Sequence, residues 1–209
     1  MKLLVLILVA LNKVCIGVRY ECNYNEVSCG CGISNVELDP LRIIGGEEAI
    51  PYSWLMIVSL RNNRQLERKH YCSGSIINKY FILTAAQCVI NMGSPSNILT
   101  ATAIHNRTDI DEIEHSVKKI FIHPNYTGHK DGFKNDIALL ELDTPLDIDE
   151  NPFHAKTCLP EINISTNQTE IFTIDNNDPI CRRSFIDPEK QICTGIYQGG
   201  KGTCRGKLF

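Results

Sequence analysis

Short apolar runs, each bounded by turn-forming residues, constrain the fold of this chain more than any other feature. They occupy residues 55–60, 75–77, 80–83, 117–122 and 137–142. Asn62-Asn63 and Asn78-Lys79 provide turn chemistry between neighbouring runs. Runs of this length at regular spacing are typical of β-strands, and the sequence has no long amphipathic helical pattern. The sequence therefore predicts an all-β fold, either a barrel or a sandwich.

The bulk composition is that of a soluble globular protein. The chain has 209 residues, enough for one domain or for two small halves that share a core. Hydrophobic residues make up 43% and charged residues 22%. The net charge of −3 provides no basic surface for nucleic acid, and no run of charge indicates binding to a membrane surface. We therefore expect no nucleic-acid partner.

Residues 1–17 have the pattern of a secretory signal peptide. Lys2 gives a positive start, residues 3–11 form an apolar run, and Cys15 and Gly17 lie at the expected cleavage site. The alternative is a membrane anchor, but the run is well short of the ~20 residues that cross a bilayer. We therefore expect a secreted, extracellular protein with no membrane span in the mature chain.

The cysteine content fits an oxidising compartment. The chain has ten cysteines, and disulfides persist outside the cytosol. Removal of Cys15 with the signal peptide leaves an odd number, so one thiol lacks an internal partner. A zinc site is the alternative, but Cys22, Cys29 and Cys31 lack the usual ligand spacing and no His-x3–5-His follows. No metal and no cofactor is expected.

Four acceptor sequons add support for export, because N-glycans are attached to surface asparagines of exported proteins. They predict glycosylation at Asn106, Asn125, Asn163 and Asn167. Residues 18–42 carry cysteines without periodic pattern and are interpreted as a pro-segment. The polar stretch 160–177 also departs from the strand pattern of the preceding residues.

Four motifs resemble, in the same order, those of the trypsin-like (chymotrypsin-fold, S1) serine proteases. They are Arg42-Ile43-Ile44-Gly45-Gly46; Tyr71-Cys72-Ser73-Gly74-Ser75 with Thr84-Ala85-Ala86-Gln87-Cys88; Asn135-Asp136-Ile137-Ala138-Leu139-Leu140; and Ile192-Cys193-Thr194-Gly195 with Gly199 to Gly206. The resemblance implies a double β-barrel, with the first barrel near complete and the second partial. Residues 43–209 would form the peptidase-like domain, truncated at its C-terminus because the resemblance ends after Gly206.

The resemblance assigns a role to each catalytic position. Asp136 takes the place of the triad acid and Gly206 that of an oxyanion-hole N–H. Gln87 replaces the triad histidine, and Leu208 replaces the nucleophilic serine. A carboxamide has no nitrogen that titrates near neutral pH, so Gln87 cannot accept a proton from a hydroxyl. Asp136 could still accept a hydrogen bond from the Gln87 carboxamide.

The zymogen features of the family are also altered. Cleavage between Arg42 and Ile43 would free an amino group, which in the family pairs with a buried aspartate. Lys207 stands at that aspartate position and would repel the ammonium of Ile43. Gly202 stands at the base of the specificity pocket, so no preference for arginine or lysine follows. The family activity, serine-type endopeptidase, is therefore not expected of this chain.

The resemblance also implies a set of disulfides. It pairs Cys72 with Cys88, pairs Cys181 with Cys193, joins Cys158 to Cys31 with Cys29 as the alternative, and leaves Cys204 unpaired. Cys22 would take whichever of Cys29 and Cys31 remains, and spacing alone leaves that choice open.

These features favour a secreted, non-catalytic serine-protease homologue that acts as a binding or decoy module. Its partners would be protease substrates, protease inhibitors or other proteases. One alternative is a trypsin-like endopeptidase represented by an incomplete chain, and another is a fragment without function. His70 is near the motif in sequence and could replace the missing base, but a packed or solvated histidine is the simpler interpretation.

Overall fold

The structure is a computed structural model that describes residues 18–20, 29–30, 36–38, 51–105 and 112–159. The expected signal peptide lies outside these residues. The same holds for the whole of residues 160–209, so the expected second barrel is not among the parts described here.

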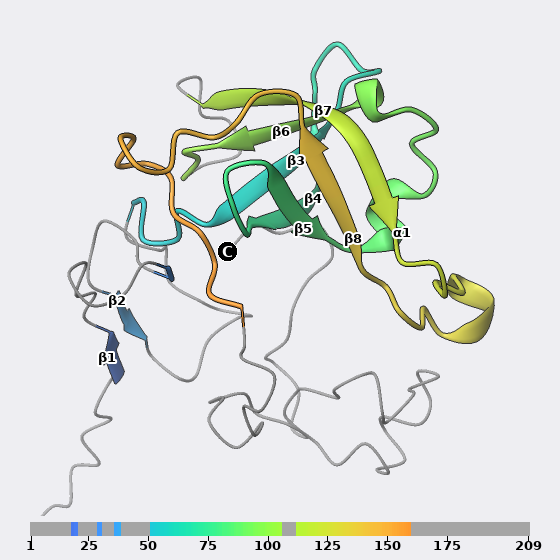
Figure 1. Cartoon of the computed structure of the whole chain (residues 1–209), viewed down its shortest axis with the longest axis horizontal. Helices are drawn as coiled ribbons and strands as arrows, with labels where there is room; N and C mark the ends of the chain where they lie inside the picture. The colour runs from blue at the N-terminus through green and yellow to red at the C-terminus, as the bar shows by residue number, and fades with distance from the viewer. Residues whose placement is uncertain (1–17, 21–28, 31–35, 39–50, 106–111, 160–209) are drawn as a thin grey trace, which may run out of the picture.

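Six antiparallel strands close into a barrel in the order β3-β4-β5-β8-β7-β6, as Figure 1 shows. Closure pairs both edges of each of these six strands, so the barrel itself has no open edge that could pair with another chain. The apolar runs alone did not distinguish a barrel from a sandwich, and the structure is a barrel. The strands are β3 (Ile57–Asn62), β4 (His70–Ile76), β5 (Phe81–Thr84), β6 (Ile98–Thr102), β7 (Ile113–Ile122) and β8 (Ala138–Leu142).

The barrel interior follows the period-two alternation of β5 and β8. In β8, Ala138, Leu140 and Leu142 are buried, while the residues between them are half-exposed. Ile82 of β5 lies opposite Leu140 and is fully buried. Because successive side chains of a strand point to opposite faces, these positions together fill one interior core. Val58, Leu60, Ile76 and Ile98 complete its fully buried aliphatic centre.

Strand β6 was not predicted, and its burial explains why. All five of its residues are buried, yet its sequence, Ile-Leu-Thr-Ala-Thr, is a short mixture of apolar and polar residues and not an apolar run. Two of the five are threonines, and Thr100 satisfies its hydroxyl by donating to the carbonyl of His115 at 3.3 Å. A strand covered on both faces reads as a short mixed run and not as a half-buried strand.

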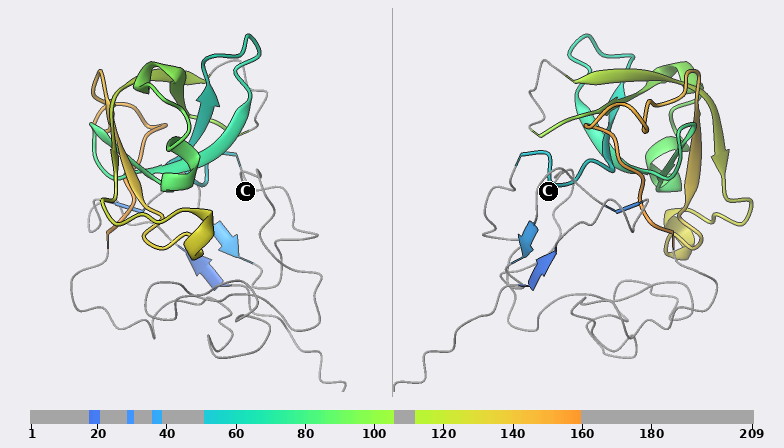
Figure 2. Two further views of the ribbon diagram at one scale, coloured as in Figure 1. Left: turned by 90° about the vertical axis from the view of Figure 1, so that its right-hand side faces the viewer. Right: turned by 60° about the vertical axis from the view of Figure 1, so that its left-hand side comes forward.

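The remaining elements are short. They are the helix α1 (Ala86–Val89), the 3-10 turns η1 (Pro95–Asn97) and η2 (His129–Asp131), and the strands β1 (Val18–Tyr20) and β2 (Val36–Leu38). The last two pair with each other within the expected pro-segment and lie outside the barrel (Figure 2). Within the described ranges no helix is long and apolar enough to cross a membrane.

A disulfide between Cys29 and Cys158 corrects the expected pairing of Cys158 with Cys31. The backbone N–H of Gly30 donates to the carbonyl of Lys156 at 2.7 Å, which brings this segment alongside the chain that leaves the barrel. Gly30 has φ +78°, and a Cβ there would lie 3.1 Å from the Cys158 sulfur. The resulting Cα–Cα separation of 5.0 Å between Cys29 and Cys158 suits a disulfide.

Glycine is required at position 74 because three strands approach closely there. A Cβ at Gly74 would lie 2.6 Å from Cγ2 of Ile82 and 2.9 Å from the carbonyl oxygen of Leu83. Backbone atoms of a closed ladder cannot move aside without loss of their hydrogen bonds.

We expect Gly74→Ala to lower the free energy of unfolding by about 1–3 kcal/mol, the usual cost of forcing an extra group into a packed core. Urea denaturation of the purified protein measures this. Ser73→Ala is the matched control, since the neighbouring side chain is exposed. Equal midpoints for the two variants would contradict the assignment of a steric requirement.

Two histidines and a threonine form a polar chain at one end of the barrel. The buried His154 donates from Nδ1 to the carbonyl of Asp147 at 3.0 Å, and its Nε2 lies 2.8 Å from the hydroxyl oxygen of Thr102, which is also 3.3 Å from the carbonyl oxygen of Ile113. Nε2 of His115 lies 3.2 Å from the same hydroxyl oxygen and can donate to it.

Acid should destabilise this end of the barrel. Burial, with a smaller contribution from His154, lowers the pKa of His115 from 6.5 to about 4. The unfolded chain therefore binds a proton at higher pH than the folded chain, and stability falls as pH drops from about 6.5 towards 4. In chemical denaturation across this range, His115→Gln should lose less stability than the wild type. The exposed His129→Gln should retain the wild-type slope, and identical slopes for all three proteins would refute the assignment.

Candidate functional site

Gln87 is the second residue of α1, the single helical turn that follows β5 after Ala85. Thr84 ends β5 and donates its hydroxyl to the carbonyl of Ser73 on β4 at 2.8 Å. A disulfide joins Cys72 to Cys88, the pairing that the resemblance implied, with the two Cα atoms 6.1 Å apart. A cross-link across a loop of this size contributes roughly 3 kcal/mol in the chain-entropy model. The turn that presents Gln87 is therefore fixed at both ends.

Asp136 reaches the same place from the start of β8. Strand β8 pairs with β5, and Ala138 lies opposite Thr84. This register puts the residues just before β8 beside those just after β5. Oδ1 of Asp136 accepts a hydrogen bond from the backbone N–H of Gln87 at 2.8 Å. The structure thus brings together two of the predicted site residues, which are 49 positions apart in sequence.

This hydrogen bond differs from the one suggested by the sequence analysis, in which the donor was the Gln87 carboxamide. Asp136 is bonded to the backbone of Gln87, and in the described part of the chain the Gln87 carboxamide makes no bond to it. The Gln87 side chain is exposed. Asp136 therefore holds the backbone at Gln87, and the Gln87 carboxamide itself cannot shuttle a proton.

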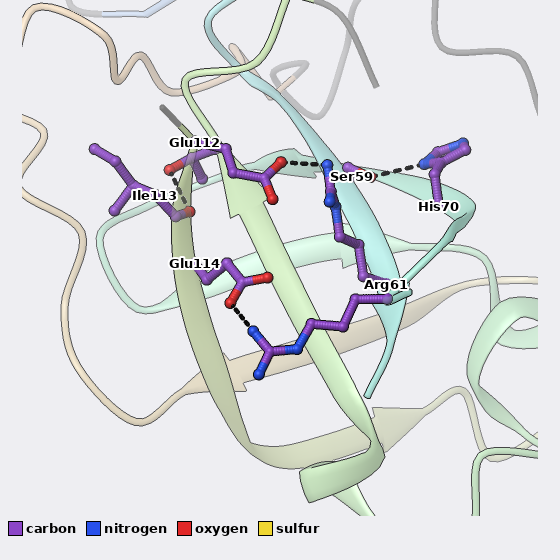
Figure 3. Close-up of polar contacts among 8 residues, drawn as sticks. Ser59, Arg61, His70, Glu112, Ile113 and Glu114 are labelled. Carbon is purple, nitrogen blue, oxygen red and sulfur yellow. Dashed lines mark hydrogen bonds and ion pairs between the residues drawn. The ribbon is translucent and has the colours of Figure 1, made fainter. Parts of the chain in front are cut away.

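The imidazole of His70 is hydrogen-bonded to Ser59 and not to Asp136. Its Nδ1 lies 2.8 Å from the hydroxyl oxygen of Ser59, and Ser59 is fully buried on β3. Figure 3 shows this imidazole directed at Ser59. None of the described histidines is hydrogen-bonded to Asp136, so the structure supports the packed interpretation of His70.

Ion pairs beside His70 link the β3–β4 hairpin to β7. Arg61 pairs with Glu112 in a largely buried contact (Figure 3). Arg68 pairs with Glu114 at 2.5 Å in a more exposed one. A buried guanidinium needs such a partner, because desolvation of an unpaired charge is costly. These residues could not be identified from the sequence, since neither pair has a motif or a local spacing.

A structured loop between β7 and β8 borders the site. The side chain of Asn135 donates to the carbonyl of Asn125 at 2.7 Å, and the N–H of Thr127 donates to the carbonyl of Lys134 at 3.3 Å. Asn135 has φ +56° and Phe133 has φ +57°, left-handed conformations that persist only where surrounding contacts hold them. Partial burial, and then the charge of Asp136, raise the pKa of Tyr126 in this loop. The loop therefore lies against the acid.

The described residues contain no group of three or more His, Cys, Asp or Glu side chains that could hold a metal ion. Several predicted site residues lie outside the described part of the chain. They are Arg42, Ile43, Gly202, Gly206, Lys207, Leu208, Cys181, Cys193, Cys204, Asn106, Asn163 and Asn167.

The closed six-stranded barrel, with an acid brought from β8 to the turn after β5, agrees with the family that the motifs indicated. The sequence model of the trypsin family matches residues 43–174. The chain belongs to the trypsin family. Bovine coagulation factor XI is a curated relative, 26% identical over 194 residues that cover 79% of this chain and 30% of that protein. This trypsin-family chain thus spans under a third of the length of that relative.

The bond from Gln87 to Asp136 predicts a structural role for the acid. We expect Asp136→Ala to leave the Gln87 N–H without its acceptor and to lower the free energy of unfolding by about 0.5–1.5 kcal/mol, the usual net contribution of a hydrogen bond, because this bond is exposed to solvent. Asp136→Asn retains a carbonyl oxygen and should lose less. Thermal and urea unfolding of the two variants measure the difference. Wild-type stability of Asp136→Ala would show that the bond contributes nothing.

Proposed function

We propose that this trypsin-family protein is non-catalytic and acts outside the cell as a binding or decoy module for protease substrates, protease inhibitors or other proteases. One observation carries the proposal. Gln87 occupies the turn position that faces the acid Asp136, and its side chain cannot take up a proton.

The chemistry of the family depends on the missing group. In active members of this family, the triad histidine accepts the proton of the serine hydroxyl, and the acid orients the imidazole. Removal of a central triad member lowers turnover by about 10⁶-fold in a well-studied serine protease. Alignment of Leu208 with the nucleophile and of Lys207 with the buried aspartate adds two further losses to the proposal.

Retention of the scaffold supports a binding role. The barrel is closed, the Cys72–Cys88 bridge fixes the turn of Gln87, and the loop between β7 and β8 is held by its own hydrogen bonds. A rigid surface loses little conformational entropy on binding, so it can recognise protein partners without performing chemistry. Two disulfides among the described residues fit an extracellular site of action.

Active-site labelling tests the proposal directly. The full chain, secreted from eukaryotic cells, is incubated with a serine-directed fluorophosphonate probe and with a panel of peptide esters, next to active trypsin. We expect no label and no hydrolysis from this chain. Binding is measured in parallel by surface plasmon resonance against immobilised trypsin and a macromolecular trypsin inhibitor. Covalent labelling of the chain would overturn the non-catalytic assignment and favour a serine endopeptidase.

Restoration of the histidine alone should not restore activity. We expect Gln87→His to fold like the wild type and to remain without measurable ester hydrolysis, because the position aligned with the nucleophile is Leu208. Gln87→Asn is the matched control for a change of the side chain at this exposed position. Turnover by Gln87→His would show that another hydroxyl serves as nucleophile and that the alignment at Leu208 is wrong.

A further inference from the structure

The sequon Asn125-Tyr126-Thr127 lies in a defined turn after β7. The N–H of Tyr126 donates to the carbonyl of His123 at 3.0 Å, and the N–H of Asn125 donates to Nδ1 of His123 at 3.1 Å. Asn125 and Thr127 are both exposed. No contact of the described structure engages the Asn125 carboxamide, so its nitrogen faces solvent ready for modification.

The position of this turn relative to the site follows from two hydrogen bonds. The carbonyl of Asn125 accepts from Asn135 at 2.7 Å, and the next residue, Asp136, accepts from the N–H of Gln87 at 2.8 Å. Tyr126, the middle residue of the sequon, is close enough to Asp136 to respond to its charge. Asn125 therefore lies at the rim of the Gln87–Asp136 site.

We propose that Asn125 carries an N-linked oligosaccharide and that this glycan shields the Gln87–Asp136 site from bulky ligands while small ones still enter. The donor is an oligosaccharide on a polyprenyl pyrophosphate. Nδ2 of Asn125 loses one proton and forms a bond to the anomeric carbon, while the bond from that carbon to the pyrophosphate oxygen breaks. No oxidation or reduction accompanies this transfer.

Steric bulk is the physical basis of the shielding. An N-glycan is a large, hydrated surface group, and the loop that bears Asn125 is held in place by the Asn135 bond. The glycan therefore restricts approach at this rim. Modification of Asn125 requires only passage through the secretory route. The shielding does not depend on the proposed binding role, and with the glycan present protein partners would bind to surfaces away from this site.

Peptide mapping of the secreted full chain tests the modification. After peptide:N-glycosidase treatment in heavy-oxygen water, the wild-type peptide with Asn125 should contain a labelled aspartate. Asn125→Gln and Thr127→Ala should each lose the mass of one glycan. Thr127→Ser is the matched control, because it keeps the sequon and should keep the glycan. A wild-type peptide with unmodified Asn125 would overturn the proposal.

Thiol labelling tests the shielding separately. Gln87→Cys is prepared with and without Asn125→Gln, and its reaction rates with N-ethylmaleimide and with a polyethylene-glycol maleimide are compared, after subtraction of labelling in the parent chain. Loss of the glycan should accelerate the large reagent several-fold and leave the small one unchanged. Asp149→Cys, exposed beyond the far end of β8, should show no such difference. Equal acceleration factors for both reagents at position 87 would refute the shielding, whatever the outcome of the activity assays.

Discussion

The pairing of β5 with β8 is the interaction on which the rest of the structure depends. Its register, with Thr84 opposite Ala138 and Ile82 opposite Leu140, is fixed because a slip by one residue would expose the buried aliphatic side chains. That register alone brings the turn after β5 next to the residues before β8. The candidate site is thus a consequence of core packing, and it persists whether or not the residues within it can react.

Asp136 has a hydrogen-bond partner at residue 87 although the side chain of Gln87 is not a base. A partly buried carboxylate needs hydrogen-bond donors, and the backbone N–H of Gln87 supplies one whatever side chain residue 87 bears. The acid therefore stabilises the turn independently of catalysis. This separation of roles explains how a chain of the trypsin family can hold the geometry of a catalytic site around a side chain without proton affinity. It also leaves the rim loop, with Asn125 on it, in an ordered position beside the site.

Prediction from sequence succeeded where the pattern is local. The apolar runs at 80–83, 117–122 and 137–142 correspond to β5, the second half of β7, and β8. It failed for β6, because its five residues are a short mixture of apolar and polar types although all of them are buried. It also failed for the partner of Cys158, because Cys29 and Cys31 differ by two positions and only the bond from Gly30 to Lys156 decides which sulfur is near. The ion pair of Arg61 with Glu112 had no sequence signal at all.

The sequence by itself determined the family, because the motifs are local patterns of residues. It also determined that the side chain of Gln87 cannot act as a base, because a carboxamide has no basic nitrogen in any conformation. Only the tertiary structure decided that Asp136 bonds the backbone of Gln87 and that Asn125 lies at the rim of their site. These contacts join residues that are apart in the chain, and closure of the barrel brings them together. Closure depends on the pairing of all six strands and cannot be inferred from any local segment.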